Sequence, residues 1–219
     1  MSVRKVLPLL LIVLLFAGDA CAKHRSNAAD NTPGSFDYYL LTLSWAPQFC
    51  ATQSSSASSS ECDPAHHYGF VVHGLWPQND DGSYPQHCAS ARPVASATVQ
   101  QMLTIMPSRG LIEHEWETHG TCSGLSAQDY FEAIRKAFSG LQVPLEYRAP
   151  TQPITASPSQ LEQKFADANH APSSAFRVSC KGSDFVALEV CLTKNLNYRA
   201  CGDDLRECRA PQVTMRPTP

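Results

Sequence analysis

The sequence lacks several features that would direct it to common classes of protein. It contains no serine or cysteine nucleophile elbow, so no catalytic nucleophile of the protein itself is indicated. It has no C-x-x-C pairs, which argues against a cysteine zinc site, and it has no internal repeats. Basic residues are not in excess, because 17 lysines and arginines stand against 20 acidic residues. Without a global positive field, a nucleic-acid partner must be attracted by a local patch.

A hydrophobic run long enough to span a membrane is also lacking. The apolar segment 6–17 follows two basic residues and ends near Ala20-Cys21-Ala22, which is typical of a cleaved secretory signal. We therefore expect a signal peptide over residues 1–22 and a periplasmic or secreted protein. The mature chain would have 197 residues and a net charge of about −4, which suits one domain. Lipidation at Cys21 is a minor alternative, because Gly18-Asp19-Ala20 matches the usual preceding residues poorly.

The cysteine count fits an exported protein. Once Cys21 is removed with the signal peptide, an even number of cysteines remains, which indicates up to four disulfides and an oxidising compartment. These eight are Cys50, Cys62, Cys88, Cys122, Cys180, Cys191, Cys201 and Cys208. Eight cysteines permit 105 pairings, so the sequence pattern alone does not fix the connectivity.

Local patterns predict a mixed set of strands and helices. Apolar and aromatic runs predict strands, periodic apolar residues and capping boxes predict helices, and Lys181-Gly182-Ser183 predicts a hairpin turn. The expected strands are 37–45, 68–76 (stopped by Gly74 and Pro77), 176–180 and 185–193, and the expected helices are 95–106, 126–138 and 157–169. Strands and helices do not alternate regularly, so we expect a single α+β domain with a central antiparallel sheet flanked by helices. We place this domain at 36–209, between a flexible lead-in (23–35) and a Pro-containing tail (210–219); 54–60 is expected to be a loop closed by a disulfide.

Histidines in two segments carry the chemistry. His114, Glu115 and His119 lie within six residues, and His73 lies upstream in 70–78. Two histidines brought together can take a proton from one oxygen and give one to another near neutral pH, and a carboxylate beside one can orient it. The other histidines of the chain we interpret as ordinary surface or core side chains, namely His24, His66, His67, His87 and His170.

A zinc peptidase is the alternative for this segment. That mechanism needs two histidines four residues apart on one helical face. His114 and His119 are five apart, so on an ideal helix they diverge by about 140°. Glu115 with His119, and His114 with Thr118, have the spacing of four instead. The spacing therefore argues against a zinc clamp.

Both segments resemble the two active-site motifs of the ribonuclease T2 family. The motifs are His73-Gly-Leu-Trp-Pro77 and His114-Glu-Trp-x-x-His-Gly-Thr-Cys122, in the family's order and separation. The resemblance extends to the first strand with Trp45 and to the cysteine-rich C-terminal quarter. Gln78 and the segment 199–202 are most similar to the bacterial branch. Trp45 and Trp116 are expected in the core or in support of the site.

The resemblance implies a reaction and a role for each residue. RNA supplies its own nucleophile, the 2′-hydroxyl; His119 would be the base on it, and His73 the acid that protonates the 5′-leaving oxygen. His114 would hold the phosphate, and Glu115 would assist at the phosphoryl centre or tune its neighbours. No metal or cofactor is implied, because histidine supplies the positive charge. The residues alone do not say which histidine is base and which is acid.

Substrate-binding residues follow from the same resemblance. Trp76, Tyr84 and Gln78 stand where the family places its first base-binding pocket, although a core position is also open for Trp76. The family often has aspartate at the position of Gln78. It commonly has lysine immediately before the second catalytic histidine, where this chain has Thr118. A hydroxyl cannot match a cation for charge stabilisation, so either activity is lower or another basic residue such as Lys181 or Arg92 reaches the phosphate.

These observations lead to one function and two rivals. We expect a monomeric, exported endoribonuclease that cleaves single-stranded RNA to 2′,3′-cyclic phosphate ends with little base specificity. A catalytically weak relative that binds RNA or protein is the competing class, and a zinc hydrolase is a third that fails on spacing. For the disulfides we hypothesise the pairs Cys50–Cys62, Cys88–Cys122, Cys180–Cys208 and Cys191–Cys201, the second of which would hold the two motifs in register.

Overall fold

The computed structural model describes residues 30–53, 60–63, 65–202 and 205–218. The predicted signal peptide, most of the lead-in and residues 54–59 of the serine-rich loop lie outside them. The strands are β1 (Tyr38–Trp45), β2 (Phe70–Gln78), β3 (Ile154–Ala156), β4 (Phe176–Lys181), β5 (Asp184–Thr193) and β6 (Val213–Met215). The helices are α1 (Ala46–Thr52), α2 (Ser96–Met102), α3 (Arg109–Thr118), α4 (Ala127–Gly140), α5 (Leu145–Arg148) and α6 (Pro158–Asn169), with 3-10 turns at Ser60–Cys62, Gly120–Cys122 and Ser173–Ala175.

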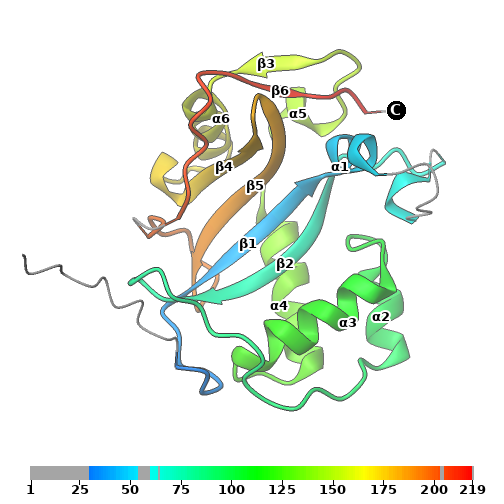
Figure 1. Ribbon diagram of the computed structural model, residues 1–219, viewed down its shortest axis with the longest axis vertical. Helices are drawn as coiled ribbons and strands as arrows, with labels where there is room; N and C mark the ends of the chain where they lie inside the picture. The colour runs from blue at the N-terminus through cyan, green and yellow to red at the C-terminus, as the bar shows by residue number, and fades with distance from the viewer. Residues whose placement is uncertain (1–29, 54–59, 64, 203–204, 219) are drawn as a thin grey trace, which may run out of the picture.

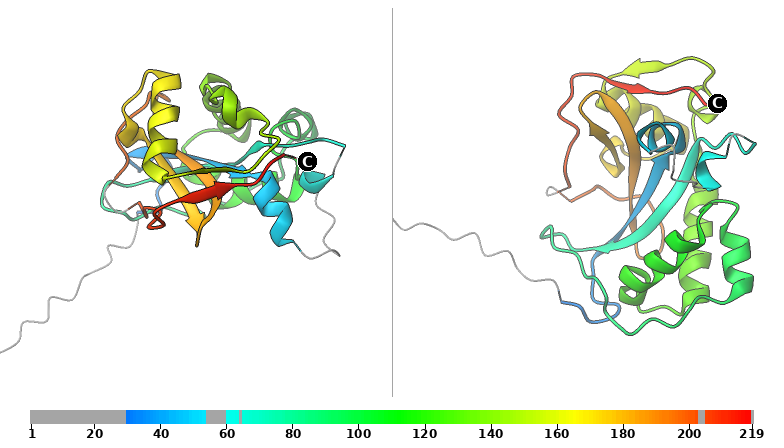
Figure 2. Two further views of the ribbon diagram at one scale, coloured as in Figure 1. Left: turned by 90° about the horizontal axis from the view of Figure 1, so that it is seen from above. Right: turned by 45° about the vertical axis from the view of Figure 1, so that its right-hand side comes forward.

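One six-stranded sheet organises the fold (Figure 1). Its order is β2-β1-β5-β6-β3, and β4 pairs with β5; every pair is antiparallel except β5 with β6. Alternate residues of β1 point to opposite faces, so Leu41 and Leu43 enter the main core with Tyr130 of α4 and Phe165 of α6. Figure 2 shows α6 lying against one side of the sheet. The predicted α+β class is confirmed.

The opposite face of the sheet is more open. Tyr38 and Leu40 of β1 point to it and form a smaller apolar cluster with Cys191 and Cys201. Trp76 and Leu205 pack at the margin of this cluster. We call this side of the sheet the open face, because it carries the groove described below.

Predicted helix starts and the hairpin are confirmed. Ser126 Oγ accepts from the backbone N–H of Asp129 at 3.2 Å and opens α4. Ser157 and Gln160 form a complete capping box at the start of α6. The hairpin of β4 and β5 follows the predicted ranges within one residue.

Several predicted boundaries are wrong. β2 continues through Gly74 and Pro77 to Gln78, because β2 is an edge strand and an edge tolerates the missing N–H of proline. The helix predicted over 95–106 ends at Met102 and continues as turns. For β2 the breaking residues were correctly located, but their effect depends on the position of the strand in the sheet.

The two ends of the domain also differ from the prediction. Residues 210–219, expected to be a tail, contribute β6, in which Val213 and Met215 are fully buried. The packed domain therefore extends beyond residue 209. Residues 30–35 of the expected lead-in turn back onto the domain, where the N–H of Gly34 donates to the carbonyl of Cys122 at 2.8 Å.

All four hypothesised disulfides are present: Cys50–Cys62, Cys88–Cys122, Cys180–Cys208 and Cys191–Cys201. The last two tie the loop after β5 to the sheet, and the first closes the serine-rich loop. Within the described ranges, no helix is long and apolar enough to cross a membrane.

Candidate active site

Helix α3 presents the second motif. Ser108 caps it by accepting from the N–H of Leu111 at 3.2 Å, and the helix ends at Thr118. The side chain of Glu115 is 1% exposed, and His119, the second histidine of the motif, lies just beyond the helix as its C-cap. The predicted spacing is confirmed, because Thr118 Oγ1 lies 3.4 Å from His114 Nδ1 one turn away.

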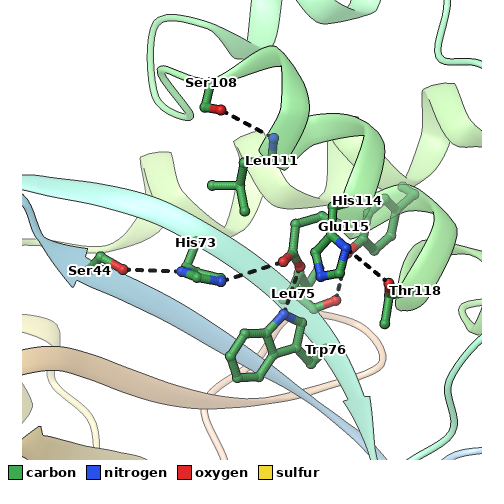
Figure 3. Close-up of polar contacts among 10 residues, drawn as sticks. Ser44, His73, Leu75, Trp76, Ser108, Leu111, His114, Glu115 and Thr118 are labelled. Atoms are coloured by element: carbon green, nitrogen blue, oxygen red, sulfur yellow. Dashed lines mark hydrogen bonds and ion pairs between the residues drawn. The ribbon is translucent and has the colours of Figure 1, made fainter. Parts of the chain in front are cut away.

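The buried carboxylate of Glu115 joins the two motifs (Figure 3). Trp76 Nε1 of β2 donates to its Oε2 at 2.7 Å, and His73 Nε2 lies 3.6 Å from its Oε1. The other ring nitrogen of His73, Nδ1, lies 3.3 Å from the hydroxyl of Ser44 on β1. Three elements, β1, β2 and α3, therefore fix the orientation of His73.

The indole of Trp76 contacts both catalytic candidates. Its ring centroid lies 5.6 Å from that of His73, edge to face, and 5.2 Å from that of His119, at an interplanar angle of 30°. The first and second motifs thus meet around one side chain. The sequence placed His73 and His119 in one site, and the structure brings them together there.

Gly74 permits this close approach of β2 to α3. A Cβ at Gly74 would lie 2.8 Å from Glu115 Cδ and closer still to Glu115 Oε2 and Trp76 Nε1. Behind the site, the fully buried Tyr130 donates its hydroxyl to the carbonyl of Leu75 at 2.9 Å. The glycine gives the room, and the tyrosine of α4 fixes the strand.

The chain after the first motif is tied to the end of α3. The Cys88–Cys122 disulfide links the two segments, and the N–H of His87 donates to the carbonyl of Thr118 at 2.8 Å. This connection confirms the Cys88–Cys122 pairing and links the segment after the first motif to the end of the second. It also brings the ring of His87, which the sequence did not single out, close enough to influence His119 electrostatically.

Burial determines the protonation of the two histidines. Burial has the largest effect and, together with the nearby rings of His114, His73 and His87, lowers the pKa of His119 to about 4. Burial also lowers the pKa of His73, with a smaller effect from His114. Both rings are therefore neutral in the free site near neutral pH. An anion bound between them would favour their protonated forms.

Burial has the opposite effect on the carboxylate. It raises the pKa of Glu115 to about 8, although the hydrogen bond from Trp76 acts against this shift. Near neutral pH this carboxyl therefore holds a proton and is able to donate a hydrogen bond. Its Oε1 is buried and makes no hydrogen bond to any described residue.

A groove of about 660 Å³ opens beside the histidines on the open face. Trp76, Gln78, Tyr84 and His119 line its near end, and Tyr84 is 51% exposed. The predicted base-binding residues therefore share one groove with a catalytic candidate. Thr118 is not among the described lining residues; its buried side chain turns to His114 instead.

The other tryptophans support the fold around the site, as expected. Trp45 is fully buried and donates its Nε1 to the carbonyl of Arg216 at 3.0 Å. Trp116 packs against Tyr130 with ring centroids 5.9 Å apart. The contact of Ser44 with His73 was not predicted, because a serine in a buried strand gives no signal in the sequence. Nowhere in the described part of the chain do three or more His, Cys, Asp or Glu gather into a group that could hold a metal ion.

Comparison with known proteins agrees with this geometry. A ribonuclease of Aeromonas hydrophila is 45% identical over 104 residues, which are 48% of this chain and 46% of that protein. A probable ribonuclease of Haemophilus influenzae is 34% identical over 142 residues, 59% of this chain and 52% of that protein. The chain thus spans about half the length of these curated relatives.

Structural similarity covers more of the chain. An RNase-related protein from Calystegia sepium superposes with a TM-score of 0.68 at 18% identity, over 84% of this chain and 98% of that one, which shows a shared fold. The model of the Ribonuclease T2 family matches residues 36–201, a range that contains both motifs and all strands from β1 to β5. The chain belongs to the ribonuclease T2 family.

Proposed function

We propose that this protein is an exported, metal-independent endoribonuclease. It cleaves single-stranded RNA by transphosphorylation from the 2′-hydroxyl, giving 2′,3′-cyclic phosphate ends with little base specificity. The observation that carries the proposal is the meeting of His73 and His119 around Trp76, with Glu115 bonded to the same indole. Two ring nitrogens and a carboxyl around one point suit a reaction whose nucleophile belongs to the substrate.

In this mechanism His119 is the base. Its pKa of about 4 keeps the ring neutral at physiological pH, so it is ready to accept the proton of the 2′-hydroxyl. His73 is the acid. The hydroxyl of Ser44 accepts from its protonated Nδ1, so that Nε2–H gives a proton to the 5′-leaving oxygen. The side chain of His73 is 42% exposed, which leaves room for a leaving group to reach it.

Glu115 and His114 act on the phosphoryl group. The protonated carboxyl of Glu115 donates a hydrogen bond to a non-bridging oxygen from Oε1, which makes no hydrogen bond to any described residue in the free site. Thr118 orients His114 by bonding to its Nδ1, which leaves Nε2 for the phosphate. This arrangement gives Thr118 a supporting role in substrate binding at the position where the family commonly has lysine.

The near end of the groove receives the base. Trp76 and Tyr84 offer aromatic faces, and stacking on such faces tolerates every base. The amide of Gln78 both donates and accepts hydrogen bonds, so it can meet different base edges. Little base specificity is the expected consequence.

Export and family branch complete the proposal. Four disulfides suit an oxidising compartment, the periplasm or the medium, reached through a signal peptide over residues 1–22. Gln78, the segment 199–202 and two bacterial relatives favour the bacterial branch. The protein acts as a monomer, and no metal or cofactor takes part.

The test uses purified protein, single-stranded RNA and excess EDTA. We expect cleavage with 2′,3′-cyclic phosphate ends, and we expect far slower cleavage by a His119→Ala control of equal thermal stability. Binding of RNA without cleavage would favour the alternative of a binding module. Cleavage that EDTA abolishes would refute the metal-independent mechanism.

A further inference from the structure

We propose that the far end of the groove on the open face is a subsite for a further nucleotide of the RNA, one step removed from the scissile phosphate. Arg206 holds the phosphate of that nucleotide, and Glu189 with Ser179 faces its base. The inference rests on the proposed function and adds an extended binding site to it.

The groove crosses the sheet. Its lining residues come from four strands, namely Trp76 on β2, Leu40 on β1, Glu189 on β5 and Ser179 on β4. β2 pairs with β1, β1 with β5 and β5 with β4, so the lining spans three inter-strand spacings. At about 4.8 Å each, this is roughly 14 Å. A strip of that length accommodates more than the one base that stacks on Trp76 and Tyr84.

The volume leads to the same conclusion. About 660 Å³ lies well within the range of roughly 300–1,000 Å³ that pockets for whole drug-sized ligands occupy. A single base at the near end leaves the far end open. The far end has both apolar and polar walls, because Leu205 of the loop after β5 lines it together with Ser179 and Glu189.

Arg206 is suited to a phosphate. It is exposed, and among the described lining residues it is the only arginine or lysine. The nearby Arg199 is already engaged, since its Nη2 lies 2.6 Å from Asp80 Oδ1 and its guanidinium lies over the ring of Tyr38 at 4.5 Å. A guanidinium binds phosphate oxygens in a bidentate manner. Arg206 is therefore the lining arginine available to a phosphate, because no hydrogen bond or ion pair joins it to another described residue.

Glu189 does not oppose an anionic ligand at acidic pH. Burial raises its pKa to about 7, although Arg177, its direct neighbour on β4, acts against the shift. On β1 its register partner is Thr42, and the phenol of Tyr38 lies near enough to sense its charge. Below pH 7 the carboxyl holds a proton, so with the hydroxyl of Ser179 it offers hydrogen-bond donors to a base edge.

The experiment compares kcat/KM on a dinucleotide with kcat/KM on two trinucleotides, which carry one extra nucleotide on either side of the cleaved bond, at pH 5.5. The variants are Arg206→Gln and a matched control, Arg135→Gln, another exposed arginine, which lies on α4 and is not among the described lining residues of the groove. We expect the wild type to prefer one trinucleotide over the dinucleotide by about tenfold, the usual contribution of a charge-assisted hydrogen bond. Arg206→Gln should lose most of this preference and cleave the dinucleotide normally, and Arg135→Gln should change neither rate.

Three results would overturn the inference. One is a wild type that cleaves the dinucleotide but gains nothing from a third nucleotide. Another is an Arg206→Gln preference equal to that of the wild type. The third is an equal loss on both substrates, which would place Arg206 at the scissile phosphate. Failure of the wild type to cleave any substrate would refute the proposed function itself, and the subsite with it, so the two failures are distinguishable.

Discussion

Replacing Gly74 with alanine tests how the two motifs are held together. The new methyl group would overlap Glu115 Oε2 and Trp76 Nε1, the two atoms of the hydrogen bond that joins β2 to α3. Glu115 is buried and the strand is fixed from behind by Tyr130, so neither partner has free space to retreat into. The strain must therefore separate β2 from α3 or break the bond.

The size of the effect follows from these contacts. Overpacking of a well-filled site costs about 1–3 kcal/mol, and a lost hydrogen bond about 1 kcal/mol more. We expect a loss of about 2–4 kcal/mol in the free energy of unfolding, which for a domain of this size lowers the melting temperature by roughly 4–16 °C. Turnover should fall as well, because the displaced Glu115 carboxyl no longer meets the phosphoryl group.

Differential scanning calorimetry of Gly74→Ala and a matched control measures this change in melting temperature. Gly140, at the end of α4, would place its new Cβ more than 4 Å from other atoms, so Gly140→Ala should leave the melting temperature unchanged or slightly raised. A Gly74→Ala protein that melts within a degree of the wild type would show that the close approach of β2 to α3 does not constrain the site.

Three further predictions concern the catalytic groups. His73→Ala and His119→Ala should each lower turnover by about two to four orders of magnitude, with a double variant far from additive, and near-normal activity in either single variant would remove that residue from the mechanism. Activity requires neutral His119 and protonated His73. Because burial lowers both pKa values, kcat/KM should rise as pH increases through about 4 and fall before pH 6.5, the ordinary pKa of histidine. A kcat/KM that stays unchanged up to pH 8 would contradict this pH dependence. Thr118→Lys should raise turnover on a dinucleotide with little change in KM, because an ammonium adds charge stabilisation; an unchanged or lower rate would show that the site is already electrostatically complete.

The sequence was most informative where structure depends on local signals. Capping residues Ser126 and Ser157 located the starts of α4 and α6, and two apolar runs joined by a turn at 181–183 located the hairpin of β4 and β5. The short strands β3 and β6 were missed, because three residues carry no periodicity and are stabilised by pairing with each other. The helix α5, of four residues, was missed for the same lack of local signal.

The site was predicted as a set of residues but not as a geometry. Both motifs were recognisable, yet no sequence pattern indicated that the glycine of the first motif makes room for Glu115. Nor did it indicate that Ser44, 29 positions before His73, would contact its ring. The groove on the open face is assembled from strands far apart in the chain. Such contacts depend on the register of the sheet, which only the folded structure provides.

The central claim is that His119 is the base and His73 the acid, and a change of leaving group tests it most directly. In a nucleoside 3′-phosphodiester of 4-nitrophenol, the leaving group departs as a stable phenolate. Cleavage of this substrate therefore needs no general acid but still needs a base. We predict that His73→Ala recovers nearly wild-type kcat/KM on this substrate while remaining impaired on a dinucleotide, and that His119→Ala is impaired on both. Recovery of His119→Ala, with His73→Ala impaired on both substrates, would contradict the assignment.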